Sequence, residues 1–299
     1  MKQLVITADD FGAAPAVNDA VEAAHANGVL TAASLMVGAP DCADAVARAK
    51  RLPSLRVGLH LVLVEGKPVL PAREVSALVD GAGNFRTNMA AAGARMFFSP
   101  RARAQLAAEI AAQFEAFAAT GLALDHCNAH KHFQLHPTIA GLIVKIGRRF
   151  GLNAMRVPAE PRNVLAKIEP VSASATDWVI APWLRVARSR LRAAGILAPD
   201  HVFGLAWSGR MTKERLLGLV RNLPDGLSEI YLHPATGADF VGAAPGYRYR
   251  DELAALLAPD VAGALNAAGI RRGGFADFLK SGEGGTVARA PNDIAGRGV

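Results

Sequence analysis

The sequence predicts an α/β fold in which seven or eight mostly parallel strands form a distorted (β/α) barrel within a single domain. Three observations predict this class: short apolar runs alternate with helical stretches, the chain has 299 residues, and polar residues recur where the apolar runs end. Alternating strands and helices indicate a parallel sheet, and this length suits one closed or nearly closed barrel. A doubly wound open sheet is the alternative.

The first half of the chain carries four strand candidates, each an apolar run rich in β-branched residues. The helical stretches between them show apolar residues at helical spacing, and Pro15 and Gly28 mark the start and end of the first one. The expected strands cover residues 4–9, 30–37, 55–64 and 123–129, and the expected helices cover residues 15–28, 41–50 and 100–121.

The second half repeats the alternation around one interruption. The expected strands are 153–158, 201–207, 229–234 and 269–279, and the expected helices are 137–150, 211–223 and 251–268. Residues 158–200 break the rhythm, so we expect an inserted excursion within a barrel domain of residues 1–280. Residues 281–299 are glycine-rich and without periodicity, which favours a disordered tail.

Composition narrows the classes of function. Two cysteines, Cys42 and Cys127, exclude a disulfide framework and a four-thiolate zinc site. The first ten residues lack the apolar region of a secretory signal, and no apolar run is long enough to span a membrane, so we expect a cytoplasmic protein. The net charge is +7, but the basic residues are dispersed and no nucleic-acid motif appears, so we expect no nucleic-acid partner.

Polar residues fall at the ends of the predicted strands. In a parallel barrel the carboxyl ends of the strands share one face, so residues distant in sequence converge there. The residues expected at this face are Asp9, Asp10, His60, Asn128, His130, His132, Arg156 and His233.

The stretch 125–137 (DHCNAHKHFQLHP) holds four of the eight histidines. If it stays extended, His126, Asn128, His130 and His132 share one strand face. An H-x-H pair at a strand end can bind one metal ion, with a third ligand from His60 or Asp10. Of the two adjacent acids, one can ligate the metal while the other acts as a general base. Taken singly, each feature also fits a structural role, as a helix cap or a hydrogen-bonded core histidine.

Five motifs together resemble the YdjC-like carbohydrate deacetylases. In chain order they are TADDFG, NDAVEAAHANGVLTAASLMV, VGLHLVL, NAHKHFQLHP and EIYLHPAT, and the resemblance runs from about residue 3 to 275. The form of the histidine cluster, with Asn128 in place of an aspartate, is most similar to the branch associated with hopanoid biosynthesis.

The resemblance implies a role for individual residues. Asp10, His60 and His130 would hold one divalent metal ion, zinc or magnesium before cobalt, nickel or manganese. Asp9 would be the base, Arg156 would orient it and His233 would be the catalytic acid. Three further residues would lie behind the ligands or contact the substrate: Asn128, Asp125 and His132. For His132, a role as a fourth metal ligand is a further alternative.

The resemblance further implies hydrolysis of the N-acetyl group of an amino sugar, with an N-acetylglucosaminyl hopanoid lipid as the expected substrate. N-acetylated chitooligosaccharides are the alternative. Residues 181–199 form an amphipathic stretch, and residues 95–101 (RMFFSPR) form a connection with two phenylalanines. Both fit a peripheral contact with the inner membrane face. For residues 181–199 we prefer the alternative, a solvated face covering the barrel. A homodimer would suit such a barrel.

Other classes of function stay open. Two histidines and a carboxylate also make the iron site of non-haem oxygenases, although these usually have an antiparallel scaffold. A glycosidase using Asp9 and Asp10 is disfavoured because adjacent strand residues face opposite ways. A sugar- or lipid-binding protein with a structural metal is the non-enzymatic alternative.

Overall fold

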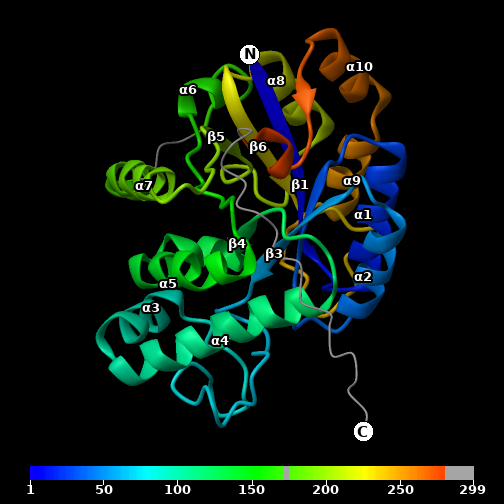
Figure 1. The fold of residues 1–299 in the computed structure, drawn as a ribbon. Coiled ribbons are helices and arrows are strands. Elements are labelled where there is room, and N and C mark those ends of the chain that lie inside the picture. The colour runs from blue at the N-terminus through cyan, green and yellow to red at the C-terminus, as the bar shows by residue number, and fades with distance from the viewer. Residues whose placement is uncertain (172–174, 280–299) are drawn as a thin grey trace, which may run out of the picture.

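A curled parallel sheet forms the centre of the molecule in the computed structural model, which describes residues 1–171 and 175–279 (Figure 1). The expected tail, residues 281–299, lies outside the described residues. The strands are β1 (Lys2–Phe11), β2 (Ala32–Leu35), β3 (Arg56–Leu61), β4 (Cys127–Ala129), β5 (His201–Phe203), β6 (Gly226–Leu232) and β7 (Arg271–Arg272).

The strand order is β4-β3-β2-β1-β6-β5, with β7 paired to β1, and every pairing is parallel. β1 is central, and Leu4 to Ala8 are all buried because both of its faces are covered. One large hydrophobic core runs from β1 to the last helix. A second, smaller cluster consists of Val5, Ala32, Ala154, Leu227, Phe275 and Phe278. The expected α/β class, the parallel sheet and the distorted, partly closed barrel are thus confirmed in one domain.

Helices cover the outer faces of the sheet. In Figure 1, α1, α2 and α9 lie on one flank of the strands, and α4, α5 and α7 lie on the other. The helices are α1 (Pro15–Asn27), α2 (Cys42–Arg51), α3 (Met89–Phe98), α4 (Pro100–Ala119), α5 (Pro137–Gly147), α6 (Arg162–Leu165), α7 (Ala175–Ala193), α8 (Lys213–Asn222), α9 (Tyr249–Leu257) and α10 (Pro259–Ala267), with 3₁₀ turns at η1 (His130–Leu135), η2 (Arg148–Phe150) and η3 (Ala276–Phe278). None of the helices in the described ranges is long and apolar enough to cross a membrane.

The segment after η2 narrows the gap between the two outer strands. Met155 makes a single parallel bridge to Cys127 of β4, and the backbone N–H of Val202 in β5 donates to the carbonyl of Ala159. The expected strand 153–158 is therefore reduced to isolated bridges. This placement carries the side chain of Arg156 into the interior, where it is completely buried.

One expectation about a connection is wrong, and one about a helix face is supported. Phe97 and Phe98 end helix α3 rather than lying in a connection, because Asn88 caps an alanine-rich helix by accepting from the N–H of Ala91. In α7, Leu191 is buried and the indole N–H of Trp183 donates to the carbonyl of Leu135. The apolar side of this helix therefore covers the barrel, as we preferred.

Candidate active site

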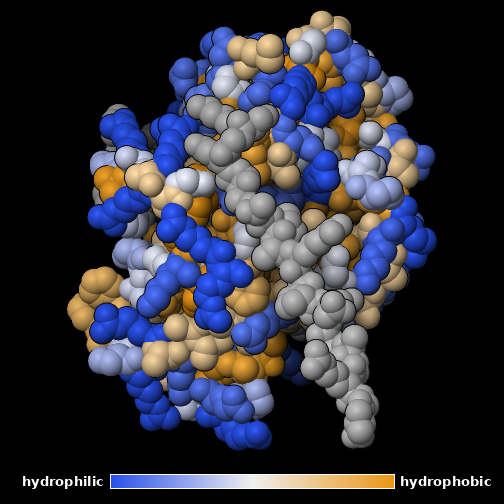
Figure 2. Space-filling view, viewed as in Figure 1, coloured by the Kyte–Doolittle hydropathy of each residue, from blue (hydrophilic) through white to orange (hydrophobic). Residues whose placement is uncertain are grey.

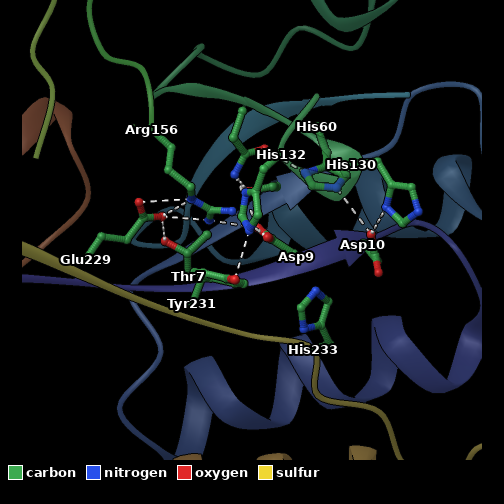
Figure 3. Close-up of polar contacts among 12 residues, drawn as sticks. Thr7, Asp9, Asp10, His60, His130, His132, Arg156, Glu229, Tyr231 and His233 are labelled. Atoms are coloured by element: carbon green, nitrogen blue, oxygen red, sulfur yellow. Dashed lines mark hydrogen bonds and ion pairs between the residues drawn. The ribbon is translucent and has the colours of Figure 1, made fainter. Parts of the chain in front are cut away.

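Asp9 and Asp10 both reach the carboxyl end of the sheet from β1. The pairing of β1 with β2 shifts register between Ala8 and Phe11, and Asp10 has a φ of 62°. This irregularity breaks the strict alternation of side chains along the strand. Both carboxylates therefore reach one site, contrary to the expectation that they face opposite ways: Asp10 lies beside His60, and Asp9 accepts from Asn128, which also bonds to His60 (Figure 3).

Asp10, His60 and His130 form a cluster that fits a divalent cation. One ligand atom of each lies within 4.8 Å of the others. Asp10 Oδ1 is 3.3 Å from His60 Nε2 and 3.3 Å from His130 Nδ1. His60 is buried near the end of β3, whereas His130 follows β4 and its side chain is 22% exposed, so the cluster is open on one side. One carboxylate and two imidazoles suit several divalent metals.

The charges in this cluster favour a cation. Burial raises the pKa of Asp10, but His130 and His60 outweigh burial and hold the pKa well below its usual range. Asp10 is therefore ionised at neutral pH and offers a negative ligand. Among the described residues, Asp10, His60 and His130 make up the one group of three or more histidine, cysteine or acidic side chains that has metal-ligand spacing.

His132 leaves the strand and points elsewhere. Lys131 and His132 both have φ of 55°, so the chain turns into η1 directly after β4. His132 Nε2 and the hydroxyl of Tyr231 form a hydrogen bond at 2.8 Å. Burial and the nearby Arg156 lower the pKa of His132 to about 3, so its ring is neutral. The extended stretch that we expected from His126 to His132 ends at Ala129, and the turn separates His132 from the metal-ligand cluster.

Arg156 joins two buried carboxylates behind the cluster. Its guanidinium donates to Asp9 at 2.5 and 3.0 Å and to Glu229 at 2.7 Å, and it lies 4.5 Å from the centre of the Tyr231 ring. The hydroxyl of Thr7 also donates to Glu229. Burial raises the pKa of Asp9, but Arg156 outweighs it, together with His60 and His233, so the pKa stays below its usual range. Asp9 is therefore an oriented, ionised carboxylate.

Sequence reasoning missed Glu229 and Tyr231 on β6. Glu229, Tyr231 and His233 are spaced two apart, so they share one face of an extended segment. Applying to EIYLHP the same alternation that we applied to the histidine cluster would have found them. Of the three, only His233 was expected at the site, because it ends the predicted strand.

His233 follows β6 and lies across Asp10 from His60 and His130 (Figure 3). Its ring is 5.7 Å from that of Tyr231 and 5.1 Å from that of Tyr247, measured between centroids. The buried Nδ1 has no hydrogen-bond partner in the described part of the chain. Burial lowers the pKa of His233 and outweighs the opposing effect of Asp10 and Asp9. The ring is therefore neutral at neutral pH.

Asn128 and Asp125 occupy different ends of the barrel interior. Asn128 is completely buried and links two site residues, accepting from His60 Nδ1 at 2.6 Å and donating to Asp9 at 3.3 Å. Asp125 precedes β4, and its carboxylate accepts from His126 Nδ1 and from the backbone N–H groups of Phe275 and Ala276. Asp125 thus does not contact the metal-ligand cluster directly.

Glu252 supports the segment that carries His233, and we expect it to make the free energy of unfolding depend on pH. Its carboxylate accepts from the backbone N–H groups of His233 and Met211, and burial raises its pKa from 4.5 to about 7. The folded state therefore holds this proton more tightly than the unfolded state. The stabilisation is present below pH 4.5 and is lost as the pH rises through 7, by about 3 kcal/mol.

Glu252→Gln is expected to remove this part of the pH dependence. The free energy of unfolding, measured in urea at pH 5 and pH 8, should change less with pH in the variant than in the wild type. Loss of a backbone hydrogen bond lowers the stability of the variant at both pH values, so only the difference between them is informative. An equal pH dependence in both proteins would contradict the raised pKa.

The fold and the site together define an α/β half-barrel protein with an aspartate-histidine cluster at the carboxyl ends of its strands. The model of the family described as YdjC-like protein matches residues 3–267, and the chain belongs to this family.

Three relatives illustrate the similarity. The chain is 29% identical to a carbohydrate deacetylase of Geobacillus stearothermophilus, over 92% of this chain and 98% of that protein. It is 30% identical to a carbohydrate deacetylase of Brevibacillus brevis, over 78% of this chain and 81% of that protein. A crystal structure from Enterococcus faecalis V583, of a protein named for cellobiose-phosphate cleavage, superposes with a TM-score of 0.73 at 25% identity, over 93% of this chain and 99% of that one.

Proposed function

We propose that this protein hydrolyses the N-acetyl group of an N-acetylated amino sugar, with one divalent metal ion held by Asp10, His60 and His130. One observation carries the proposal: a three-residue cluster with metal-ligand spacing lies beside an ionised carboxylate that is not part of it, Asp9. The relatives named carbohydrate deacetylases support the choice of substrate and reaction. When bound, the metal supplies Lewis-acid polarisation of the acetamide carbonyl and lowers the pKa of a water molecule.

The residues of the chain divide the proton transfers between them. Asp9 accepts a proton from the attacking water, and Arg156 keeps its carboxylate ionised and oriented. His233 donates a proton to the departing amine, because an amine anion is a poor leaving group. His233 is neutral before the reaction, so it must first take up this proton. The proton that Asp9 receives would pass to His233 and from there to the amine, because the low pKa of Asp9 makes its protonated form strongly acidic.

Within this class, the specific substrate that we propose is an N-acetylglucosaminyl hopanoid lipid, with an N-acetylated chitooligosaccharide as the alternative. The resemblance of the histidine cluster supports the lipid. We would incubate metal-reconstituted protein with each compound and follow loss of one acetyl group by mass spectrometry, with a chelator control. Chelator-sensitive loss from the lipid alone is expected. Loss from the oligosaccharide alone would keep the reaction and overturn the lipid substrate, and no loss from either would contradict the proposal.

The same experiment separates the other classes. A non-haem iron oxygenase would consume oxygen in the presence of iron, and a sugar-binding protein would return its ligand unchanged. The parallel scaffold disfavours an oxygenase. Neither an oxygenase nor a binding protein has a use for Asp9 as a base and His233 as an acid. Titration calorimetry with zinc, magnesium, manganese, cobalt and nickel identifies the preferred metal.

A peripheral contact with an anionic membrane is part of this proposal, because a lipid-linked substrate lies at such a surface. Phe97 is 47% exposed and Phe98 is 77% exposed, and exposed arginines, Arg95 and Arg101, flank them. Figure 2 shows apolar residues at the left edge of this face, over α3. Exposed aromatic rings beside cationic side chains are typical of membrane-surface contacts.

The double variant Phe97→Ser/Phe98→Ser is expected to lose binding to vesicles that contain anionic phosphatidylglycerol. Co-sedimentation measures the bound fraction, with neutral phosphatidylcholine vesicles for comparison. Val241→Ser is the matched control, because Val241 is 96% exposed and should not affect binding. Equal binding by the double variant and the wild type would contradict the contact. A change in sedimentation velocity instead would assign the two phenylalanines to a dimer interface.

A further inference from the structure

A line of buried polar side chains crosses the barrel interior from Asp125 to His60. His126 Nδ1 is 2.9 Å from Asp125 Oδ2, and His126 Nε2 is 3.0 Å from Ser34 Oγ. Asn128 Nδ2 donates to Ser34 Oγ at 2.9 Å, and Asn128 Oδ1 is 2.6 Å from His60 Nδ1. Ser34, His126 and Asn128 are all completely buried, so water does not substitute for any of these bonds.

The chemistry of these groups allows one consistent direction of hydrogen bonding. An ionised carboxylate only accepts, so His126 donates from Nδ1 and its Nε2 accepts from the hydroxyl of Ser34. Burial raises the pKa of Asp125, but His126 and two backbone N–H groups outweigh it and lower the pKa, which keeps the carboxylate ionised. Ser34 Oγ then accepts from the amide nitrogen of Asn128.

The amide of Asn128 is consequently fixed in orientation. Its nitrogen donates to both Ser34 and Asp9, so its oxygen faces His60. That oxygen accepts only from a protonated Nδ1 of His60. His60 Nε2 is then the nitrogen that faces Asp10 and the metal-ligand cluster.

Packing holds the ring of His126 in place. A Cβ atom at Gly58 would lie 2.5 Å from the His126 ring, so glycine at this position of β3 makes room for it. The ring of Phe275 packs on it at 4.7 Å between centroids. His126 is therefore held by its neighbours rather than by Asp125 alone.

We propose that Ser34 and His126 are positioning residues which, through Asn128, hold His60 with Nδ1 protonated and leave Nε2 as the ligand for the cation. The part of this inference that concerns the metal rests on the proposed function. The protonation of His60 Nδ1 does not, and can be measured in the metal-free protein. Residues behind a histidine ligand typically change metal affinity about 10- to 100-fold.

Two variants break the line at different places. Ser34→Ala removes the hydroxyl, and His126→Asn keeps an amide near Asp125 but has no atom at the position of Nε2. In both, we expect the His60 Nδ1–H signal in spectra of ¹⁵N-histidine-labelled, metal-free protein to exchange with solvent faster or to disappear. The zinc Kd of each should rise about tenfold.

Thr31→Val is the matched control. Thr31 lies three residues before Ser34, and its partly buried hydroxyl accepts from the N–H of Ile6 and donates to the carbonyl of Ile6, but it is not part of the line. It should lower stability without changing the His60 signal or the zinc Kd. If His126→Asn does not fold, Ser34→Ala decides, because it removes a single oxygen.

The outcomes separate the two proposals. An unchanged Nδ1–H signal and a zinc Kd within about twofold of wild type in Ser34→Ala would overturn the positioning role. A wild-type protein that binds no metal and removes no acetyl group would overturn the proposed function. In that case the Nδ1–H signal of the metal-free variants still tests the positioning of His60.

Discussion

Asp9→Asn is expected to lower kcat/KM for deacetylation about a thousandfold, within the range that a general base contributes. The amide cannot accept the proton from the attacking water, whereas the other residues of the site keep their places. Arg156 retains its hydrogen bonds to Glu229. Metal affinity should stay within about threefold of wild type, because Asp9 is not part of the metal-ligand cluster. Steady-state kinetics and titration calorimetry on the same preparation measure both quantities.

Asp10→Asn is the matched control for this prediction, since it changes the adjacent carboxylate in the same way. It should weaken metal binding, because Asp10 is the charged member of the cluster. Full activity of Asp9→Asn would refute its role as the base. Loss of metal binding in Asp9→Asn would instead place it among the ligands.

Arg156→Leu is expected to lower the free energy of unfolding by about 3–5 kcal/mol, the range measured when one partner of a buried ion pair is removed. Asp9 and Glu229 are 2% and 0% exposed, and Arg156 lies between them. Without the guanidinium, two carboxylates remain close together in the interior and must be protonated or reach water. Denaturant unfolding at pH 7 measures the loss.

Two further variants test the cause of this loss. Adding Glu229→Gln to Arg156→Leu should recover part of the stability, because it removes one of the two uncompensated charges. Arg192→Leu breaks an ion pair with Asp200 in which Arg192 is 52% exposed, and it should cost only about 0–1 kcal/mol. If Arg156→Leu and Arg192→Leu cost the same, the buried network is not a principal source of stability.

Much of the fold could be predicted from the sequence because its signals are local. Apolar runs and helical stripes placed the strands β1, β2, β3 and β6 and the helices α1, α2, α4 and α8, and Pro137 marked the start of α5. The convergence of Asp10, His60 and His130 also follows from a local rule, since each lies at or beyond the carboxyl end of a parallel strand. The helix α3 escaped prediction because we assigned residues 95–101 to a connection, although Ala92, Gly93 and Met96 form a buried face of this helix.

The α/β class and the strand ends at which the aspartates and histidines meet follow from the pattern of residues along the chain. The directions in which these side chains point depend on the three-dimensional packing. The register shift in β1 and the positive φ of Asp10 bring Asp9 and Asp10 to one site, and the left-handed residues Lys131 and His132 take His132 away from the cluster. The line from Asp125 to His60 likewise joins residues from three strands. These features depend on contacts between segments distant in the chain, whose geometry no local pattern of residues contains.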